Sequence, residues 1–115
     1  MEEQYEIVHY EENGHDIYQE WLDSLRDLRG RSAIIRAVKR AEKGNFGVHR
    51  FCRDDVWELV LDTGPGYRVY YSQVGCVLVL LLCAGSKRTQ NRDIEKATEY
   101  LKRYKEVYGH DSIHH

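Results

Sequence analysis

The run of apolar residues from Val77 to Ala84, which reads "VLVLLLCA", is the feature that most constrains the fold. Successive side chains of a strand point to opposite faces of its sheet, so this run is apolar on both faces. Such a strand is typical of the centre of a sheet that is covered on both sides or nearly so. The run is far too short to cross a bilayer, and the chain starts with acidic residues, so we expect neither a signal peptide nor a membrane contact.

The stretch just before this strand, "GPGYRVYY", holds the only proline of the chain. Glycine tolerates a positive φ and proline presets its own φ, so Thr63–Gly66 is predicted to connect two strands as a tight turn. A fixed turn fixes the register of the hairpin. By alternation, Arg68 and Tyr70 then share one face with Glu58 and Val60, opposite the core face.

The remaining elements follow from periodicity and from turn residues. The sequence predicts, in order, a short strand at 4–10, helices at 15–28 and 32–43, sheet from 47 to 84 and a helix at 92–108. The order β-α-α-β-β-β-α indicates an α+β fold with a twisted antiparallel sheet and helices mainly on one face. We expect a single domain over residues 1–108 and a flexible tail at 109–115, whose histidines are assigned no role.

Length and composition exclude several classes of protein. A chain of 115 residues is long enough for one core. The three cysteines, Cys52, Cys76 and Cys83, have neither a CxxC spacing nor an even number, which indicates a reducing cytoplasm without disulfides or a zinc site. The sequence has no P-loop, GxGxxG, HExxH or nucleophile elbow, so no metal or cofactor is expected.

The net charge of −2 hides an asymmetry between two parts of the chain. Residues 1–30 carry nine acids and two bases, a net charge of −7, whereas residues 31–105 carry fifteen bases and eight acids, a net charge of +7. Solvated helix faces often give such a distribution. A gradient of this size also concentrates positive potential on one side, which suits a polyanionic partner such as a nucleic acid.

Arg68 has two interpretations. On the outer face of a hairpin, an arginine is often a cross-strand ion-pair partner, here for Glu58. Alternatively, Arg68 is a rigid donor to a phosphate, because the guanidinium group matches phosphate geometry and keeps its charge. Lys87 and Arg88, just after the apolar strand, and Arg92, one turn into the last helix, are placed to join it beside a helix N-terminus, which attracts phosphate.

Candidate groups for proton transfer are fewer. His49 lies at the start of the sheet region, where a lone histidine is more often structural than catalytic. Glu58 and the phenol of Tyr70 share the face of Arg68, which makes them the other candidates on this side of the sheet.

The segments "GPGYRVYY", "VLVLLLC" and "AGSKRTQNRDIEKATEYLKRY" follow one another, after an upstream "WLDSLRD" and a basic helix ending in "EKGNFG". This combination, over roughly residues 5–105, resembles the RelE/ParE superfamily of bacterial toxins, and within it the HigB-like killer proteins of phage-derived addiction modules. The combination is more specific than any of its parts, and it implies a RelE-like fold.

The resemblance implies the toxin of a type II toxin–antitoxin system, which stops growth by ribosome-associated cleavage of mRNA until a cognate antitoxin neutralises it. Such a metal-independent endoribonuclease uses the ribose 2′-hydroxyl as nucleophile, so it needs cationic groups around the phosphate and proton transfer at two oxygens. Arg68 matches the arginine of the family's "GYR" strand, and Lys87, with Arg88 beside it, matches a basic position after the glycine. Glu58 and His49 complete the catalytic candidates.

The residues expected to contact RNA are basic or aromatic and lie on three elements: Arg36, Lys39, Arg40, Lys43, Arg50, Arg53, Tyr70 and Arg92. The family commonly reads "ELR" where this chain has Glu58, Leu59 and Val60, so valine replaces an expected arginine, for which Arg50 or Arg53 is a possible substitute. Two other functions therefore stay open. One is a ParE-like poison of DNA gyrase that cuts no RNA, and the other is an orphan module that keeps only the fold and the antitoxin surface.

Overall fold

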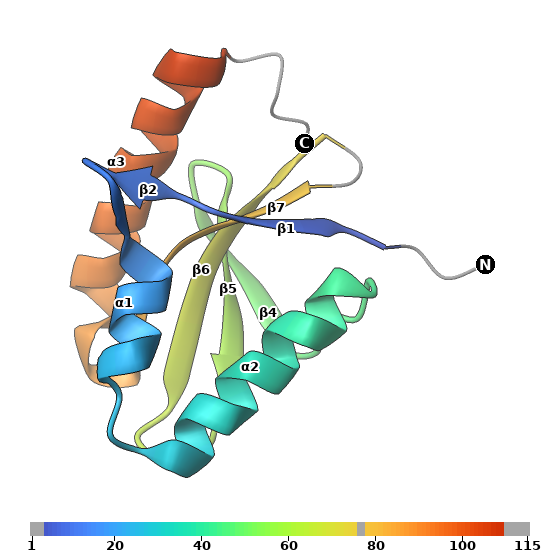
Figure 1. Ribbon diagram of the computed structural model, residues 1–115, viewed down its shortest axis with the longest axis vertical. Helices are drawn as coiled ribbons and strands as arrows, with labels where there is room; N and C mark the ends of the chain where they lie inside the picture. Colours follow the sequence, from blue (N-terminus) through green and yellow to red (C-terminus); the bar gives the residue numbers. More distant parts are fainter. Residues whose placement is uncertain (1–3, 76–77, 110–115) are drawn as a thin grey trace.

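In the computed structural model, which describes residues 4–75 and 78–109, a five-stranded sheet runs through the molecule (Figure 1). Its strands are β1 (Glu6–His9), β4 (His49–Arg53), β5 (Val56–Leu61), β6 (Tyr67–Val74) and β7 (Leu78–Ser86). The other elements are the hairpin β2 (Glu11–Glu12) and β3 (His15–Asp16), the helices α1 (Ile17–Ser24), α2 (Leu28–Glu42) and α3 (Gln90–Tyr108), and the short 3-10 helix η1 (Lys87–Thr89). The strand order across the sheet is β1-β7-β6-β5-β4.

The α+β class predicted from the sequence is confirmed, but the sheet is mixed rather than wholly antiparallel. β1 runs parallel to β7, with Glu6 opposite Leu78 and His9 opposite Leu81, whereas the other pairs are antiparallel. Periodicity reveals which face of a strand is buried and says nothing of the direction of its neighbour. From Leu78 to Leu81, the apolar strand β7 therefore has β1 on one side and β6 on the other.

Helices cover both faces of the sheet: two of the three pack on one face, and the third packs on the other. α1 and α2 pack on the face that carries Leu59, Val69 and Leu81, and α3 packs on the face that carries Tyr70 and Leu80. Because β7 is apolar on both faces, each face needs a covering layer, and the third helix supplies the second one. The domain therefore has three layers, with the sheet in the middle.

A bulge in β7 changes which side chains face α3. The register between β6 and β7 shifts between Tyr70 and Tyr71, where Tyr70 lies opposite Cys83 and Tyr71 lies opposite Leu81. As a result the consecutive residues Leu82 and Cys83 both pack under α3, and Ala84 returns to the face of α1 and α2. Bulges of this kind redirect side chains near the end of a strand.

The first two helices begin at aspartates. The side chain of Asp16 accepts the N–H of Gln19 at the start of α1, and that of Asp27 accepts the N–H of Gly30 at the start of α2. Gly30 therefore lies inside the first turn of α2, which begins at Leu28 rather than at the predicted residue 32. A glycine is needed there because a Cβ would lie 2.4 Å from the ring of Tyr67.

The hairpin of β5 and β6 has the register that the alternation predicted. Glu58 lies opposite Tyr70, and Val60 lies opposite Arg68. In the turn, the N–H of Gly66 donates to the carbonyl of Thr63 over 3.1 Å, and both Gly64 and Gly66 have a positive φ, of 58° and 82°.

None of the described helices is long and apolar enough to cross a membrane. The predictions for Cys76, for Val77 and for the tail from residue 110 onwards fall outside the described residues.

Asp27 links α2 to the sheet and should make stability depend on pH. Its carboxylate accepts the hydroxyl of Tyr67 over 2.7 Å as well as the N–H of Gly30, and these bonds, that from Tyr67 first, lower its pKa below the usual 3.8. A lowered pKa in the folded state gives a stabilisation that is complete above the unfolded pKa and is lost as the pH falls through the folded pKa.

We expect Asp27→Asn to lower the midpoint of thermal unfolding at neutral pH, and we expect the difference from wild type to shrink as the pH falls below about 4. Thermal unfolding followed by circular dichroism between pH 3 and pH 7 measures this difference. Asp62→Asn, which removes an exposed carboxylate, is the control. A difference for Asp27→Asn that is constant over the whole range contradicts the assignment.

Candidate nucleic-acid interface

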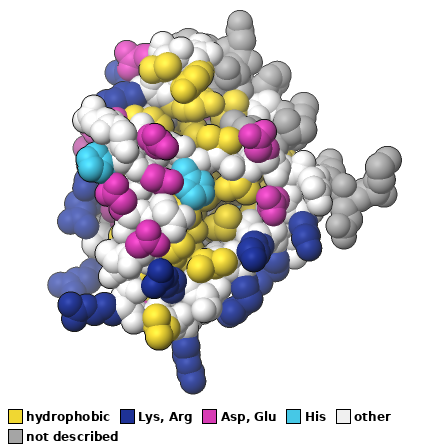
Figure 2. All heavy atoms as spheres, in the orientation of Figure 1, with side chains coloured by type: hydrophobic (Ala, Val, Ile, Leu, Met, Phe, Trp, Pro, Cys, Tyr) yellow, Lys and Arg dark blue, Asp and Glu magenta, His cyan; other side chains and the backbone are white. Residues whose placement is uncertain are grey.

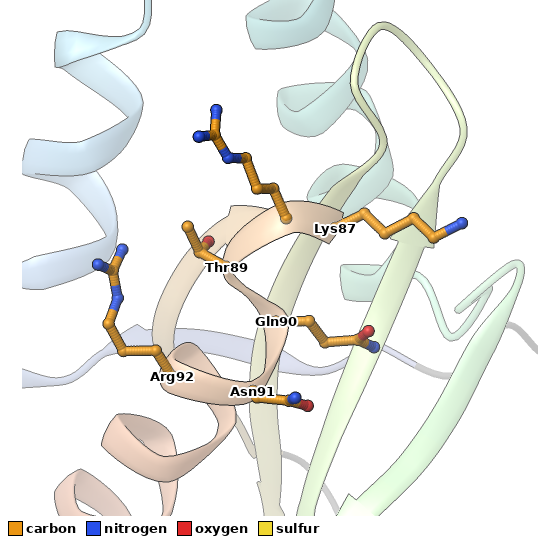
Figure 3. A pocket seen from close by; sticks show the side chains of 6 residues that line it. Lys87, Thr89, Gln90, Asn91 and Arg92 are labelled. Carbon is orange, nitrogen blue, oxygen red and sulfur yellow. The ribbon is translucent and has the colours of Figure 1, made fainter.

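A basic segment follows the end of β7. η1 and the first turn of α3 form a cavity of about 350 Å³ that is lined by the six consecutive residues from Lys87 to Arg92 (Figure 3). Lys87, Arg88 and Arg92 are exposed. Three cations beside the N-terminal end of a 19-residue helix make a surface of positive potential.

The turn before β6 lies against this segment. The N–H of Lys87 donates to the carbonyl of Gly66 over 2.6 Å. A Cβ built on Gly66 would lie 3.5 Å from Cβ of Lys87 and 3.5 Å from Nη1 of Arg68, so the lysine and the arginine both border the turn. The structure thus brings Arg68 and Lys87, which are far apart in the sequence, to one place.

Arg68 is buried rather than exposed, with 4% of its surface accessible. Its Nη1 donates to the carbonyl of Tyr67 over 3.0 Å and lies 3.5 Å from that of Leu61. The expected ion pair with Glu58 is absent from the described residues, because Arg68 lies opposite Val60 and Gly85. The guanidinium group therefore lies beneath the turn, where carbonyl oxygens hold it in place.

Glu58 is a buried tether between the sheet and α3. Only 3% of it is exposed, and its two carboxylate oxygens accept Nε2 of Gln90 over 3.0 and 3.1 Å. Nε of Arg50, opposite it on β4, lies 3.3 Å from Oε2. The carboxylate is thus held by two side chains, one of them the exposed Arg50, and lies beneath the start of α3.

Tyr70 does not lie on the surface. It is fully buried under α3, and its hydroxyl has no hydrogen-bond partner among the described residues. Burial, and after it the negative charges of Glu58 and Asp93, raise the pKa of Tyr70 well above its usual value. The phenol is therefore out of reach of solvent in this structure.

His49 lies on the other face of the sheet from Arg68 and Glu58. It is exposed on the edge strand β4, opposite Leu59, and its ring lies 5.8 Å from that of Trp57 and 6.0 Å from that of Phe46. The structure therefore does not bring this histidine to the basic segment.

The other predicted RNA contacts form separate surfaces. The four basic residues predicted on the second helix are exposed: Arg36, Lys39 and Arg40 lie on α2, and Lys43 follows its last residue. Figure 2 shows Lys and Arg side chains along the lower rim of the molecule, over α2, and Asp and Glu side chains above them, over α1. Arg53 is exposed at the end of β4.

The sequence alone did not single out Gln90 and Asp93, and it indicated Thr89 only as a possible N-cap of the last helix. Asp93 is 6% exposed and accepts the hydroxyl of Thr89, and a Cβ on Gly85 would lie 1.9 Å from its Oδ2. Gly85 and Asp93 thus fix α3 on the end of β7. The sequence does show a run of polar residues at the start of the last helix. It does not show that Gln90 bonds Glu58 on β5 or that Asp93 lies against Gly85 on β7.

Cys52 and Cys83 are free thiols, and burial raises the pKa of each to about 12. A thiol with a raised pKa is a poor nucleophile. Among the described residues, no group of three or more His, Cys, Asp or Glu side chains is arranged to hold a metal ion.

No family model matches the chain. The chain is similar to an uncharacterized protein of Haemophilus influenzae, with 44% identity over 80 residues that cover 70% of this chain and 81% of that protein.

The tether between Glu58 and Gln90 gives a prediction. Gln90→Ala removes both hydrogen bonds from Nε2, and we expect it to lower the free energy of unfolding by about 1–3 kcal/mol, because a buried carboxylate loses a donor. Asn91→Ala changes an exposed amide of the same turn and should cost less than about 0.5 kcal/mol. Urea denaturation of both variants measures the difference, and equal effects would show that the tether contributes nothing.

Proposed function

We propose that this chain, which belongs to the same family as that Haemophilus influenzae protein, is the toxin of a type II toxin–antitoxin pair that acts on mRNA. The observation that carries the proposal is the meeting of Arg68 and Lys87 at Gly66, with Arg88 and Arg92 exposed beside them. The resemblance of the sequence to RelE/ParE toxins of the HigB-like group supports the same function.

The chemistry that this arrangement supports is stabilisation of a phosphate. Cleavage of RNA by its own 2′-hydroxyl builds negative charge on the phosphate oxygens, and fixed cations lower the free energy of that transition state. Lys87 and Arg88 reach solvent and are able to contact the phosphate directly. Arg68 is held from below and contributes a fixed positive charge that needs no reorganisation.

The exposed basic face of α2 supports binding to a large polyanion. Arg36, Lys39, Arg40 and Lys43 form a second basic strip on the side of the sheet opposite α3. A ribosome offers phosphates over a wide surface, so we propose that α2 contacts ribosomal RNA in the cytoplasm while the basic segment after β7 meets mRNA. A cognate antitoxin would cover one or both surfaces.

A second function, a ParE-like poison of DNA gyrase, is favoured by the position of the proton-transfer candidates. Glu58 is buried and already bonded to Gln90, and His49 lies on the other face of the sheet. A toxin that binds its target without cleaving RNA needs no general base. An orphan module that retains the fold without toxicity is the third possibility.

A matched pair of variants tests the proposal in living bacteria. We expect induction of the wild-type chain, in a strain without the antitoxin, to stop growth and to produce mRNA cleavage that primer extension detects on translated transcripts. Lys87→Ala with Arg88→Ala should abolish both effects, because two exposed phosphate contacts are lost. Lys102→Ala removes an exposed lysine further along α3 and should leave both effects unchanged.

The outcomes separate the three functions. Growth arrest with uncut transcripts and inhibited DNA supercoiling would replace the nuclease by the gyrase poison. Normal growth on induction of a folded wild-type chain would leave the orphan module. Full toxicity of the double variant would remove Lys87 and Arg88 from the site.

A further inference from the structure

The second half of β7 has a strand neighbour on one side only. β1 pairs with β7 from Leu78 to Leu81, and no other described strand continues that edge. The stretch from Cys83 to Ser86 lines a cavity of about 430 Å³, with residues of α1 on one side and residues of α3 on the other. In Figure 1 the end of β7 passes behind α1 toward the start of α3. Main-chain groups on an unpaired strand edge are able to form hydrogen bonds with a ligand.

The walls of this cavity are aromatic and aliphatic. α1 contributes Ile17 and Trp21, Leu25 follows the end of α1, the hairpin contributes Tyr67, and α3 contributes Tyr100. The rings of Trp21 and Tyr67 meet edge to face, with centroids 5.9 Å apart, and Trp21 is half-buried. The volume lies within the range of about 300–1,000 Å³ that is usual for pockets that take small organic ligands.

The rim of the cavity is basic and continuous with the segment after β7. Arg92 and Lys96 are exposed residues of α3 that line the cavity. Arg92 and Thr89 also line the neighbouring cavity of the basic segment, and Figure 3 shows the side chain of Arg92 directed toward the side of α1. Asp93, the acidic residue of the lining, is buried; it accepts the hydroxyl of Thr89 and lies 3.9 Å from Nε of Arg92.

We propose that this cavity between α1 and α3 binds an unstacked nucleobase of the RNA whose phosphates contact the basic segment. The inference rests on the proposed action on RNA and adds a subsite to it. Single-stranded RNA is commonly held by base contacts with aromatic rings and by cations along its backbone, and here both lie within one hollow. The edge of β7 that has no strand neighbour adds main-chain groups to this hollow, of which the carbonyl of Ser86 already accepts the hydroxyl of Thr89 over 3.3 Å.

The two tryptophans of the chain allow a direct test. Trp21 lines the cavity, whereas Trp57 lies on β5 against Phe51 and His49. In a Trp57→Phe variant, Trp21 is the only fluorescent indole. We expect nucleoside 5′-monophosphates to quench its emission saturably, after correction for absorption, and we expect ribose 5-phosphate, which lacks a base, to give no saturable quenching at the same concentrations.

A matched pair of lysine variants locates the effect. In the Trp57→Phe background, Lys96→Ala should raise the apparent Kd of the quenching nucleotide about threefold or more, because a cation at the rim is lost. Lys102→Ala should leave the Kd unchanged. Near-ultraviolet circular dichroism confirms that each variant is folded.

Three results would overturn the proposal. Equal responses to ribose 5-phosphate and to the nucleotides would show a phosphate site without a base pocket. Binding of a dye-labelled single-stranded RNA, seen by fluorescence anisotropy, with unchanged emission of Trp21 would place the bases elsewhere and leave the proposed function intact. Absence of RNA binding together with absence of growth arrest would overturn both the subsite and the proposed function.

Discussion

The burial of β7 on both faces is the constraint on which the rest of the structure depends. A strand with apolar side chains in both directions must have a layer on each side, and α1 with α2 supplies one layer while α3 supplies the other. Because α3 follows β7 after one short 3-10 turn, its N-terminus has to lie at the end of the sheet. Lys87, the first residue of that turn, therefore meets the hairpin turn at Gly66.

Two kinds of positive charge result from this arrangement. Arg68 is enclosed and held by carbonyl oxygens, so its position is fixed but its access to solvent is small. Lys87 and Arg88 are exposed and able to move toward a ligand. This arrangement suits an anion that arrives from solution. The buried charge of Arg68 makes the local potential positive before the anion binds, and the exposed side chains of Lys87 and Arg88 then contact the anion. The hydrogen bonds from Gln90 to Glu58 hold the start of α3 against the sheet.

The parts of the fold that follow from local rules could be predicted from the sequence. The alternation around Thr63–Gly66 fixed the faces of Arg68 and Glu58, because the side-chain period of a strand is two. The parallel direction of β1 and the side on which α3 packs could not be predicted. An apolar stripe shows which face of an element is buried, but it does not show which other element covers that face. The burial of Arg68 was also missed, because a polar residue between apolar ones is normally expected to face solvent. The partnership of Glu58 with Gln90 joins residues 32 positions apart, which no local pattern encodes.

The most direct test of the central claim, that the basic segment after β7 binds RNA phosphates, is the salt dependence of RNA affinity. Binding of a dye-labelled single-stranded RNA would be followed by fluorescence anisotropy at several salt concentrations, for the wild-type chain and for Lys87→Ala with Arg88→Ala. Each phosphate contact on a single strand contributes about 0.7 to the slope of log affinity against log salt, so the double variant should bind more weakly, with a slope shallower by about 1.4. Equal affinities and equal slopes for the two proteins would contradict the account.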